Sequence, residues 1–113
     1  MNRKYSILLL RRKHTLNIHI SNAALTWFKD EVGLQAGSHV RFYPMIYGNS
    51  PVQENFSLGF SIEAPVDAIS SVTVEEIQFY VEETDVWFFN GHDLYVEYNE
   101  TMDEVEYQYK MPK

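Results

Sequence analysis

The chain has 113 residues, a formal net charge of −7 at pH 7 and no cysteine, which excludes disulfides, thiolate zinc sites, cysteine nucleophiles and thiolate-held iron–sulfur clusters. Its length is that of one domain with a sizeable core. Fourteen Asp and Glu residues lie between Phe42 and Tyr109, where there is no Lys or Arg, so a surface built from this segment repels nucleic acid and anionic lipid and favours a basic protein partner.

Residues 1–13 form a basic leader, in which an apolar run at residues 7–10 is followed at once by three basic residues. The run is too short for a secretory signal, and no small-residue cleavage site follows it. Because chain ends are weakly tied down, we expect this leader to be disordered or loosely docked, or else to add an edge strand. A basic tag for a membrane surface is the less favoured interpretation. We expect a single cytoplasmic domain over residues 14–113.

The first predicted elements are a strand and a helix. Apolar and polar residues alternate over residues 16–20, which predicts a half-buried strand. Ser21 is a suitable N-cap for the helix that follows. The apolar residues between 22 and 32 fall on one stripe, and Gly33 is expected to end the helix.

Two longer strands are predicted next. The first covers residues 38–47, and Pro44 within it implies an edge, a bulge or a bend, because proline cannot donate to a strand ladder. Residues 48–51 are turn formers and predict a loop. The second strand, residues 56–63, alternates large apolar residues with small or polar ones, so one of its faces belongs to the core.

The C-terminal half continues with strands. Alternation resumes at residues 77–81, and a short helix is then expected, capped by Thr84 and closed by Gly91 in a left-handed conformation. Two final strands are predicted at residues 94–98 and 105–109. Strands dominate and helices are few, which predicts an α+β fold with a mostly antiparallel or mixed sheet, one main helix near the N-terminus and one short helix.

Five segments in this order resemble the HesB/IscA-like domain of the A-type iron–sulfur cluster carriers. They are LNIHISNAA at 16–24, VRFY at 40–43, GNS at 48–50, FSLGF at 56–60 and NGHDLYV at 90–96. The resemblance spans about residues 16–98 and implies that family's fold. The family ligates its cluster through a cysteine in the loop, which falls near Asn49 here, and a Cys-Gly-Cys near the C-terminus, which residues 99–105 lack. The chain therefore resembles a cysteine-free HesB-like subgroup, for which no reaction is implied.

Metal and catalytic chemistry have weak support in the residues. His39, His92 and Asp93 are the candidate metal ligands, but no histidine pair has the spacing of a metal site on a helix or strand. We expect no bound cofactor. The adjacent acids at 75–76 and 82–83 point to opposite faces of an extended chain, so they are expected to form a solvated surface.

A protein-binding surface is the preferred interpretation. Tyr43 and Tyr47 share one strand face that leads into the loop with Asn49 and Ser50, although such aromatic stripes in strands most often cover a core. Tyr107 and Tyr109 could extend this surface. The acidic surface adds a second set of expected contacts, which comprises Glu97, Glu100 and Glu104.

The expected function is therefore a non-catalytic interaction module that lacks cluster ligands, binds a protein with a basic surface and acts in iron–sulfur metabolism. It is expected to bind neither nucleic acid nor membrane. One alternative is a small-molecule or metal-binding module that uses His39 and the loop near residue 48. A second alternative is an enzyme in which two carboxylates from distant strands converge in a pocket.

Overall fold

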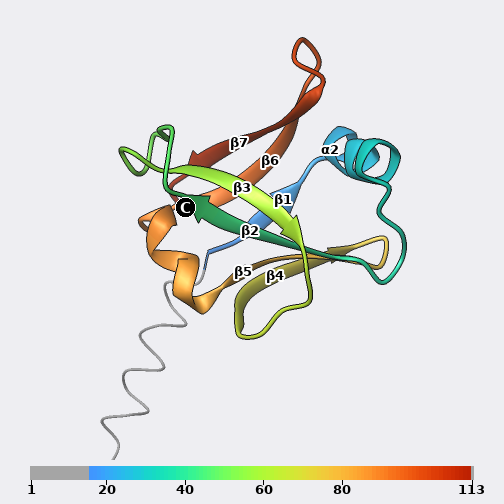
Figure 1. Ribbon diagram of the computed structural model, residues 1–113, viewed down its shortest axis with the longest axis horizontal. Helices are drawn as coiled ribbons and strands as arrows, with labels where there is room; N and C mark the ends of the chain where they lie inside the picture. The colour runs from blue at the N-terminus through green and yellow to red at the C-terminus, as the bar shows by residue number, and fades with distance from the viewer. Residues whose placement is uncertain (1–15, 113) are drawn as a thin grey trace, which may run out of the picture.

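The computed structural model describes residues 16–112, so the predicted leader at residues 1–13 lies outside the described part of the chain. The described chain is α+β, as predicted, and Figure 1 shows two sheets with short helical segments at their sides. The elements in chain order are β1 (Ile18–Ile20), α2 (Asn22–Trp27), η1 (Phe28–Val32), β2 (His39–Met45), β3 (Ser57–Ile62), β4 (Ala68–Val74), β5 (Ile77–Glu82), η2 (Glu83–Phe89), β6 (Asp93–Asn99) and β7 (Glu104–Lys110).

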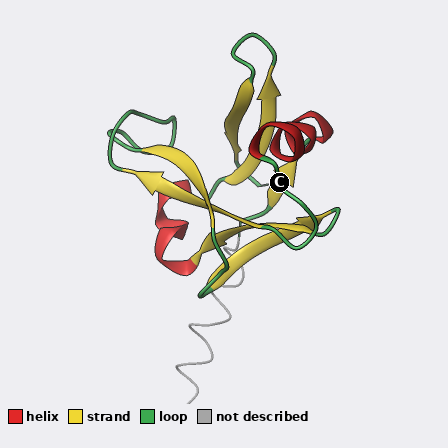
Figure 2. Cartoon of the chain, turned by 45° about the vertical axis from the view of Figure 1, so that its right-hand side comes forward, coloured by secondary structure: helices red, strands yellow, loops and turns green. Residues whose placement is uncertain are grey.

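Both sheets mix parallel and antiparallel pairs. One has the order β1-β6-β7, and the other has the order β3-β2-β5-β4. The β1–β6 and β2–β5 pairs are parallel, whereas the three hairpin pairs are antiparallel. Figure 2 shows the strands of the two sheets with helical segments on either side of them. The sheets share one core, in which the ring of Tyr107 on β7 stands edge-on to Phe42 on β2 at 5.8 Å between centroids.

The first helical segment begins and ends where the sequence predicts. The Ser21 hydroxyl oxygen accepts a hydrogen bond from the Ala24 backbone N–H at 3.0 Å, and Gly33 ends the segment in the left-handed region at φ 84°. Its α-helical part covers only α2, and η1 continues it as a π-helix. None of the helices in residues 16–112 is long and apolar enough to cross a membrane.

Pro44 lies where the predicted edge begins. β2 has β5 as a parallel neighbour only from His39 to Phe42, whereas its antiparallel pairing with β3 continues to Met45. Pro44 pairs with Leu58 of β3 beyond the end of the β5 ladder. The missing N–H therefore costs no hydrogen bond to a second strand, which confirms the interpretation of this proline.

The strand β4 is missing from the sequence prediction. It pairs with β5 through a turn whose two central residues, Glu75 and Glu76, both have positive φ, at 49° and 65°. The expectation that these two acids lie in extended chain is therefore wrong.

The short second helix also differs at its ends. η2 is a 3₁₀-helix that starts at Glu83, so Thr84 lies inside it and the prediction of a Thr84 cap is wrong. Asn90, with φ 48°, is the left-handed residue that closes η2, and Gly91 follows with φ 81°. Asparagine is the commonest non-glycine residue for this position because its short polar side chain tolerates the left-handed region.

Candidate functional site

The structure separates the two groups of predicted contact residues. Tyr43 and Tyr47 lie at the end of β2 and in the loop that follows it, whereas the three acids of the second group lie on the hairpin of β6 and β7. In Figure 1 this loop and the tip of that hairpin project in different directions. Glu97 stands opposite Glu106 in the strand register, and Glu104 stands opposite Asn99. A partner that contacts one group need not contact the other.

An exposed apolar region follows the end of β2. Ile46 is 84% exposed and Tyr47 is 67% exposed, and the Tyr47 hydroxyl donates to the sulfur of Met45 at 3.3 Å. Across the loop, Phe56 stands edge-on to the ring of Trp87 on η2, at 5.1 Å between centroids, and Trp87 is 47% exposed.

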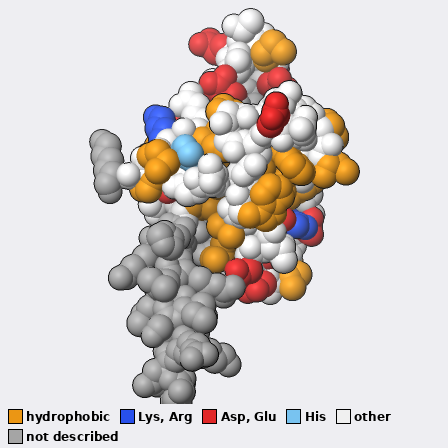
Figure 3. All heavy atoms as spheres, turned by 90° about the vertical axis from the view of Figure 1, so that its left-hand side faces the viewer, with side chains coloured by type: hydrophobic (Ala, Val, Ile, Leu, Met, Phe, Trp, Pro, Cys, Tyr) orange, Lys and Arg blue, Asp and Glu red, His pale blue; other side chains and the backbone are white. Residues whose placement is uncertain are grey.

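We call these five residues, Met45, Ile46, Tyr47, Phe56 and Trp87, the loop surface. Figure 3 faces this side of the molecule and shows hydrophobic side chains gathered on it, with Asp and Glu side chains above and below. Exposed aromatic and aliphatic residues with a polar surround are typical of protein-binding surfaces.

Hydrogen bonds within the loop hold this surface in place. The Asn49 side-chain oxygen accepts from the Asn55 backbone N–H at 2.7 Å, and the Ser50 hydroxyl oxygen accepts from the Gln53 backbone N–H at 3.1 Å. Asn49 and Ser50 therefore act on their own loop. The Ser57 hydroxyl on β3 donates to the Tyr47 carbonyl oxygen at 2.8 Å, and this hydrogen bond connects the loop to β3.

Gly59 on β3 makes room for the loop surface. A Cβ placed on this glycine would stand 2.6 Å from the sulfur of Met45, which is closer than van der Waals contact permits. The absence of a side chain at Gly59 lets Met45 lie against β3, and Tyr47 in turn donates to that sulfur. This contact gives a physical reason for glycine in the middle of an otherwise regular strand.

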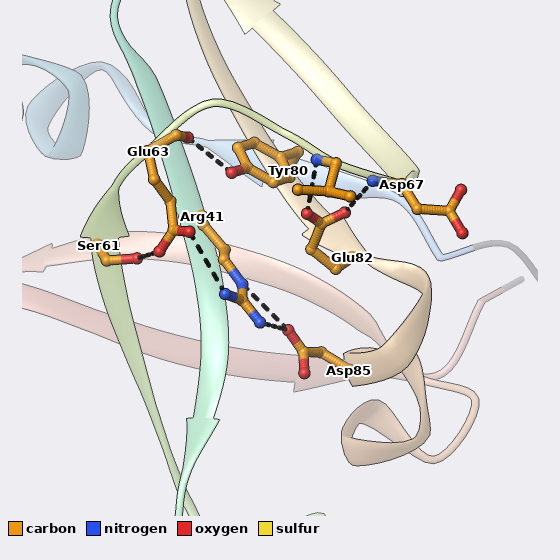
Figure 4. A network of polar contacts seen from close by, with 8 residues as sticks. Arg41, Ser61, Glu63, Asp67, Tyr80, Glu82 and Asp85 are labelled. Carbon is orange, nitrogen blue, oxygen red and sulfur yellow. Dashed lines mark hydrogen bonds and ion pairs between the residues drawn. The ribbon is translucent and has the colours of Figure 1, made fainter.

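An ion-pair network joins η2 to β2 (Figure 4). The Arg41 guanidinium on β2 contacts Asp85 Oδ2 through Nη2 at 2.7 Å and through Nε at 3.2 Å, and its Nη1 lies 3.5 Å from Glu63 Oε1. The hydrogen bond to Asp85 is the main cause of a raised pKa of Arg41. Because Asp85 is buried and lies two residues before Trp87, this pair fixes η2 against β2.

The same network closes the loop between β3 and β4. The Tyr80 hydroxyl donates to the Glu63 carbonyl oxygen at 2.6 Å, and burial raises the pKa of Tyr80. The Glu82 carboxylate accepts from the backbone N–H groups of Val66 and Asp67 at 2.8 and 2.7 Å. Glu82 is buried, so the expectation of a solvated surface is wrong for this residue.

The candidate metal ligands each have another partner. His39 Nδ1 lies 2.7 Å from the side-chain oxygen of Gln78, and the Asp93 carboxylate accepts from the Asn17 backbone N–H at 2.8 Å. His92 Nδ1 lies 3.0 Å from a backbone carbonyl oxygen of η2. Within residues 16–112, no three His, Asp or Glu side chains are grouped closely enough to hold a metal ion.

Sequence reasoning did not identify Ile46 and Trp87 as members of the surface. Both belong to apolar patterns that predict burial, and their exposure depends on where β2 ends and how η2 is rotated. The suggested extension through Tyr107 and Tyr109 is wrong, because both rings pack against the core and burial raises the pKa of each.

Comparison with known proteins identifies relatives that match the chain over most of its length. The chain is 41% identical over 95 residues to a Bacillus subtilis protein named pyruvate dehydrogenase inhibitor, in a match that covers 84% of the chain and 100% of that relative. It is also 30% identical over 98 residues to an uncharacterised protein of Staphylococcus saprophyticus, with 84% and 100% covered, and 30% identical over 96 residues to one of Staphylococcus epidermidis, with 82% and 98% covered.

No protein-family model matches the chain, and no solved structure matches it significantly. The resemblance to HesB-like domains therefore stays a prediction. The match to the three relatives is sufficient to group them, because it extends over nearly the whole of each relative. The chain belongs to the protein family that includes the pyruvate dehydrogenase inhibitor of Bacillus subtilis.

Proposed function

We propose that this protein is a cytoplasmic, non-catalytic regulator that binds a bacterial pyruvate dehydrogenase complex and lowers its activity through the loop surface. The observation that carries the proposal is the 41% identity over the full length of a relative named as an inhibitor of pyruvate dehydrogenase. An inhibitor of a large enzyme needs a surface for contact. It does not need catalytic groups of its own.

The loop surface supports this proposal through its composition and its rigidity. Ile46, Tyr47 and Trp87 present apolar area to solvent, and buried aromatic residues carry much of the energy of typical protein interfaces. The hydrogen bonds of Asn49 and Ser50 and the Arg41–Asp85 pair hold this area in one arrangement. A preorganised surface loses little conformational entropy on binding.

The proposal is tested by the rate of pyruvate-dependent NAD reduction with a purified bacterial pyruvate dehydrogenase complex. Increasing amounts of the intact protein should lower the rate to a plateau. Ile46→Asp should raise the concentration needed for half inhibition at least about tenfold, because a charge would be desolvated at the centre of the contact.

Val66→Asp is the matched control. Val66 is 91% exposed and lies in the loop between β3 and β4, so the substitution adds the same charge outside the loop surface. This variant should inhibit like the unchanged protein. An unchanged rate at saturating protein would disprove the inhibitor function, and equal inhibition by the Ile46→Asp and Val66→Asp variants would disprove the role of the loop surface.

The predicted connection to iron–sulfur metabolism remains a separate proposal. It rests on the HesB-like resemblance alone. A protein captured by the loop surface that assembles or carries clusters, in place of a dehydrogenase, would favour it.

A further inference from the structure

A groove lies between the first helical segment and the hairpin of β6 and β7. It has a volume of about 400 Å³, and its aromatic lining comes from Trp27 and Tyr98. Asp30, Glu31 and Asp103 contribute carboxylates to the same lining. Figures 1 and 2 place α2 beside this hairpin and on the opposite side of the molecule from the loop that carries Tyr47.

The aromatic side chains of the groove are held in place by their polar ends. The Trp27 indole N–H donates to the Asp103 carbonyl oxygen at 3.0 Å, and the Tyr98 hydroxyl donates to Asp103 Oδ1 at 2.6 Å. The Trp27 ring also stands edge-on to Phe28 and Phe60, at 5.3 and 6.1 Å between centroids. The groove therefore has rigid walls, and a ligand would not need to order them.

The groove has no cation of its own in the described chain. Residues 16–112 contain three Lys and Arg residues, and each has a partner elsewhere. Lys29 pairs with Glu75 at 2.6 Å, Arg41 pairs with Asp85, and the Lys110 ammonium lies 4.3 Å from the centre of the Tyr95 ring.

Negative charge near the Tyr98 phenol also affects its pKa. Its pKa is raised, first by the hydrogen bond to Asp103 and then by burial and by the negative charges of Asp103, Glu100 and Glu31. The groove thus combines flat aromatic walls with an uncompensated negative potential.

We propose that this groove binds an arginine side chain presented by a protein partner. A guanidinium is planar, stacks on tryptophan and tyrosine rings, and offers a fork of donors that matches a carboxylate. Arginine therefore fits the groove better than the compact ammonium of lysine. This contact does not depend on the proposed inhibition of pyruvate dehydrogenase, because the groove lies on a different side of the molecule from the loop surface.

The test uses the full chain labelled with ¹⁵N and the peptide acetyl-Gly-Arg-Gly-amide as the probe. The chain has two tryptophans, Trp27 and Trp87, so their indole N–H resonances report on the groove and on the loop surface separately. The arginine peptide should shift the Trp27 resonance in a saturable way and leave the Trp87 resonance in place. The matched peptide with citrulline, which has the same shape without the charge, should shift neither resonance.

Glu31→Gln should weaken the binding of the arginine peptide about two- to fivefold, as expected for the loss of one exposed ion pair. Asp67→Asn removes one exposed carboxylate charge from the loop between β3 and β4, outside the lining of the groove, and should leave binding unchanged. Equal shifts with the citrulline peptide, or no shift of Trp27 with the arginine peptide, would overturn the proposal.

The chain's own basic residues are the competing occupant. If replacement of Arg11, Arg12 and Lys13 by Gln shifts the Trp27 resonance in the absence of any peptide, the groove holds the chain's own N-terminal segment, and the assignment to a partner is wrong. An unchanged Trp27 resonance in that variant, together with binding of the arginine peptide, would support the assignment to a partner.

Discussion

Some residues have backbone conformations of high free energy that the sequence pattern does not predict. Glu75 and Glu76 fill both central positions of the turn between β4 and β5 with positive φ. A two-residue turn of this kind suits the twist of antiparallel strands, and it is usually built from Asn and Gly. A side chain with a Cβ in the left-handed region costs about 1–2 kcal/mol per residue. The same fold would therefore be more stable with glycine or asparagine at these two positions.

Glu76→Gly should raise the free energy of unfolding by about 0.5–1 kcal/mol, because glycine relieves the left-handed strain at φ 65° and only part of the gain is lost to the entropy of the unfolded chain. Urea denaturation measures the change. Glu76→Ala is the control, because it removes the same charge and keeps the strained Cβ. A stabilisation of equal size in both variants would mean that charge, and not backbone conformation, is the cause.

Glu82→Gln should lower the free energy of unfolding by about 1–3 kcal/mol, because a neutral amide offers one oxygen to the two backbone N–H groups that the carboxylate now accepts. Thermal unfolding followed by circular dichroism is a suitable measurement. The exposed neighbour Asp67, changed to Asn, serves as the control and should change stability by less than about 0.5 kcal/mol. Equal effects of the two substitutions would contradict a stabilising role for the two hydrogen bonds that the Glu82 carboxylate accepts.

At the scale of elements, the Arg41–Asp85 pair connects β2 to η2, and Glu63 adds the loop after β3. Arg41→Met should lower the free energy of unfolding by about 2–3 kcal/mol, because Asp85 would stay buried without its partner and the side chain of Arg41 is only about one quarter exposed. A double-mutant cycle with Asp85→Asn measures this coupling by chemical denaturation. Additive effects of the two substitutions would show that the pair does not act as a unit.

The sequence predicts those elements whose apolar residues repeat clearly. Apolar residues recur at every second position in β2, β3, β6 and β7, and the helix ends at Ser21 and Gly33 have their usual residues. The sequence pattern does not predict β4, because the residue it buries is Ser70, whose hydroxyl donates to the Leu16 carbonyl oxygen at 2.7 Å, and because two glutamates form its turn. An edge strand whose buried residue is a serine has little of the hydrophobic alternation that predicts a strand.

The sequence predicts only the part of the candidate site that depends on local patterns. Tyr47 is exposed as the protein-binding interpretation requires, since alternation along β2 and the turn formers after it are local signals. The exposure of Trp87 depends on the Arg41–Asp85 pair, which joins residues 44 positions apart. A contact between residues so far apart in the sequence cannot be predicted from a single amino-acid sequence. The sequence therefore indicates the loop but not the helix that completes the surface.

For the whole molecule, burial of phenols makes stability depend on alkaline pH. The pKa of Tyr107 lies well above its usual value of 10.0, mainly because burial disfavours the phenolate. The unfolded chain loses this proton near pH 10 while the folded chain keeps it. The contribution is therefore fully present below about pH 10 and is lost as the pH rises further, by about 1.4 kcal/mol per pH unit.

Urea unfolding from about pH 9 to about pH 11 should show this loss, and Tyr107→Phe should reduce its slope, because phenylalanine has no proton to release. Phenylalanine keeps the ring contact with Phe42, so stability at neutral pH should change little. The same slope in the variant and in the unchanged protein would contradict the assignment to Tyr107.

The net negative charge of the molecule should increase the rate at which it associates with a basic partner. Reversal of charge at Glu97, Glu100 and Glu104 should slow association with a basic partner more than it speeds dissociation, because exposed charges steer the approach over distances of about a Debye length. Surface plasmon resonance at low and at physiological salt separates the two rates. Rates that do not respond to salt would leave the acidic surface without a role in binding.

Hydrogen–deuterium exchange, measured with and without a pyruvate dehydrogenase complex, shows whether the loop surface contacts that complex. Binding should protect backbone amides in residues 45–57 and in η2, where the loop surface lies, because contact excludes water and suppresses local opening. Protection confined to other elements, or unchanged exchange throughout residues 16–112 at a saturating amount of the complex, would contradict the account.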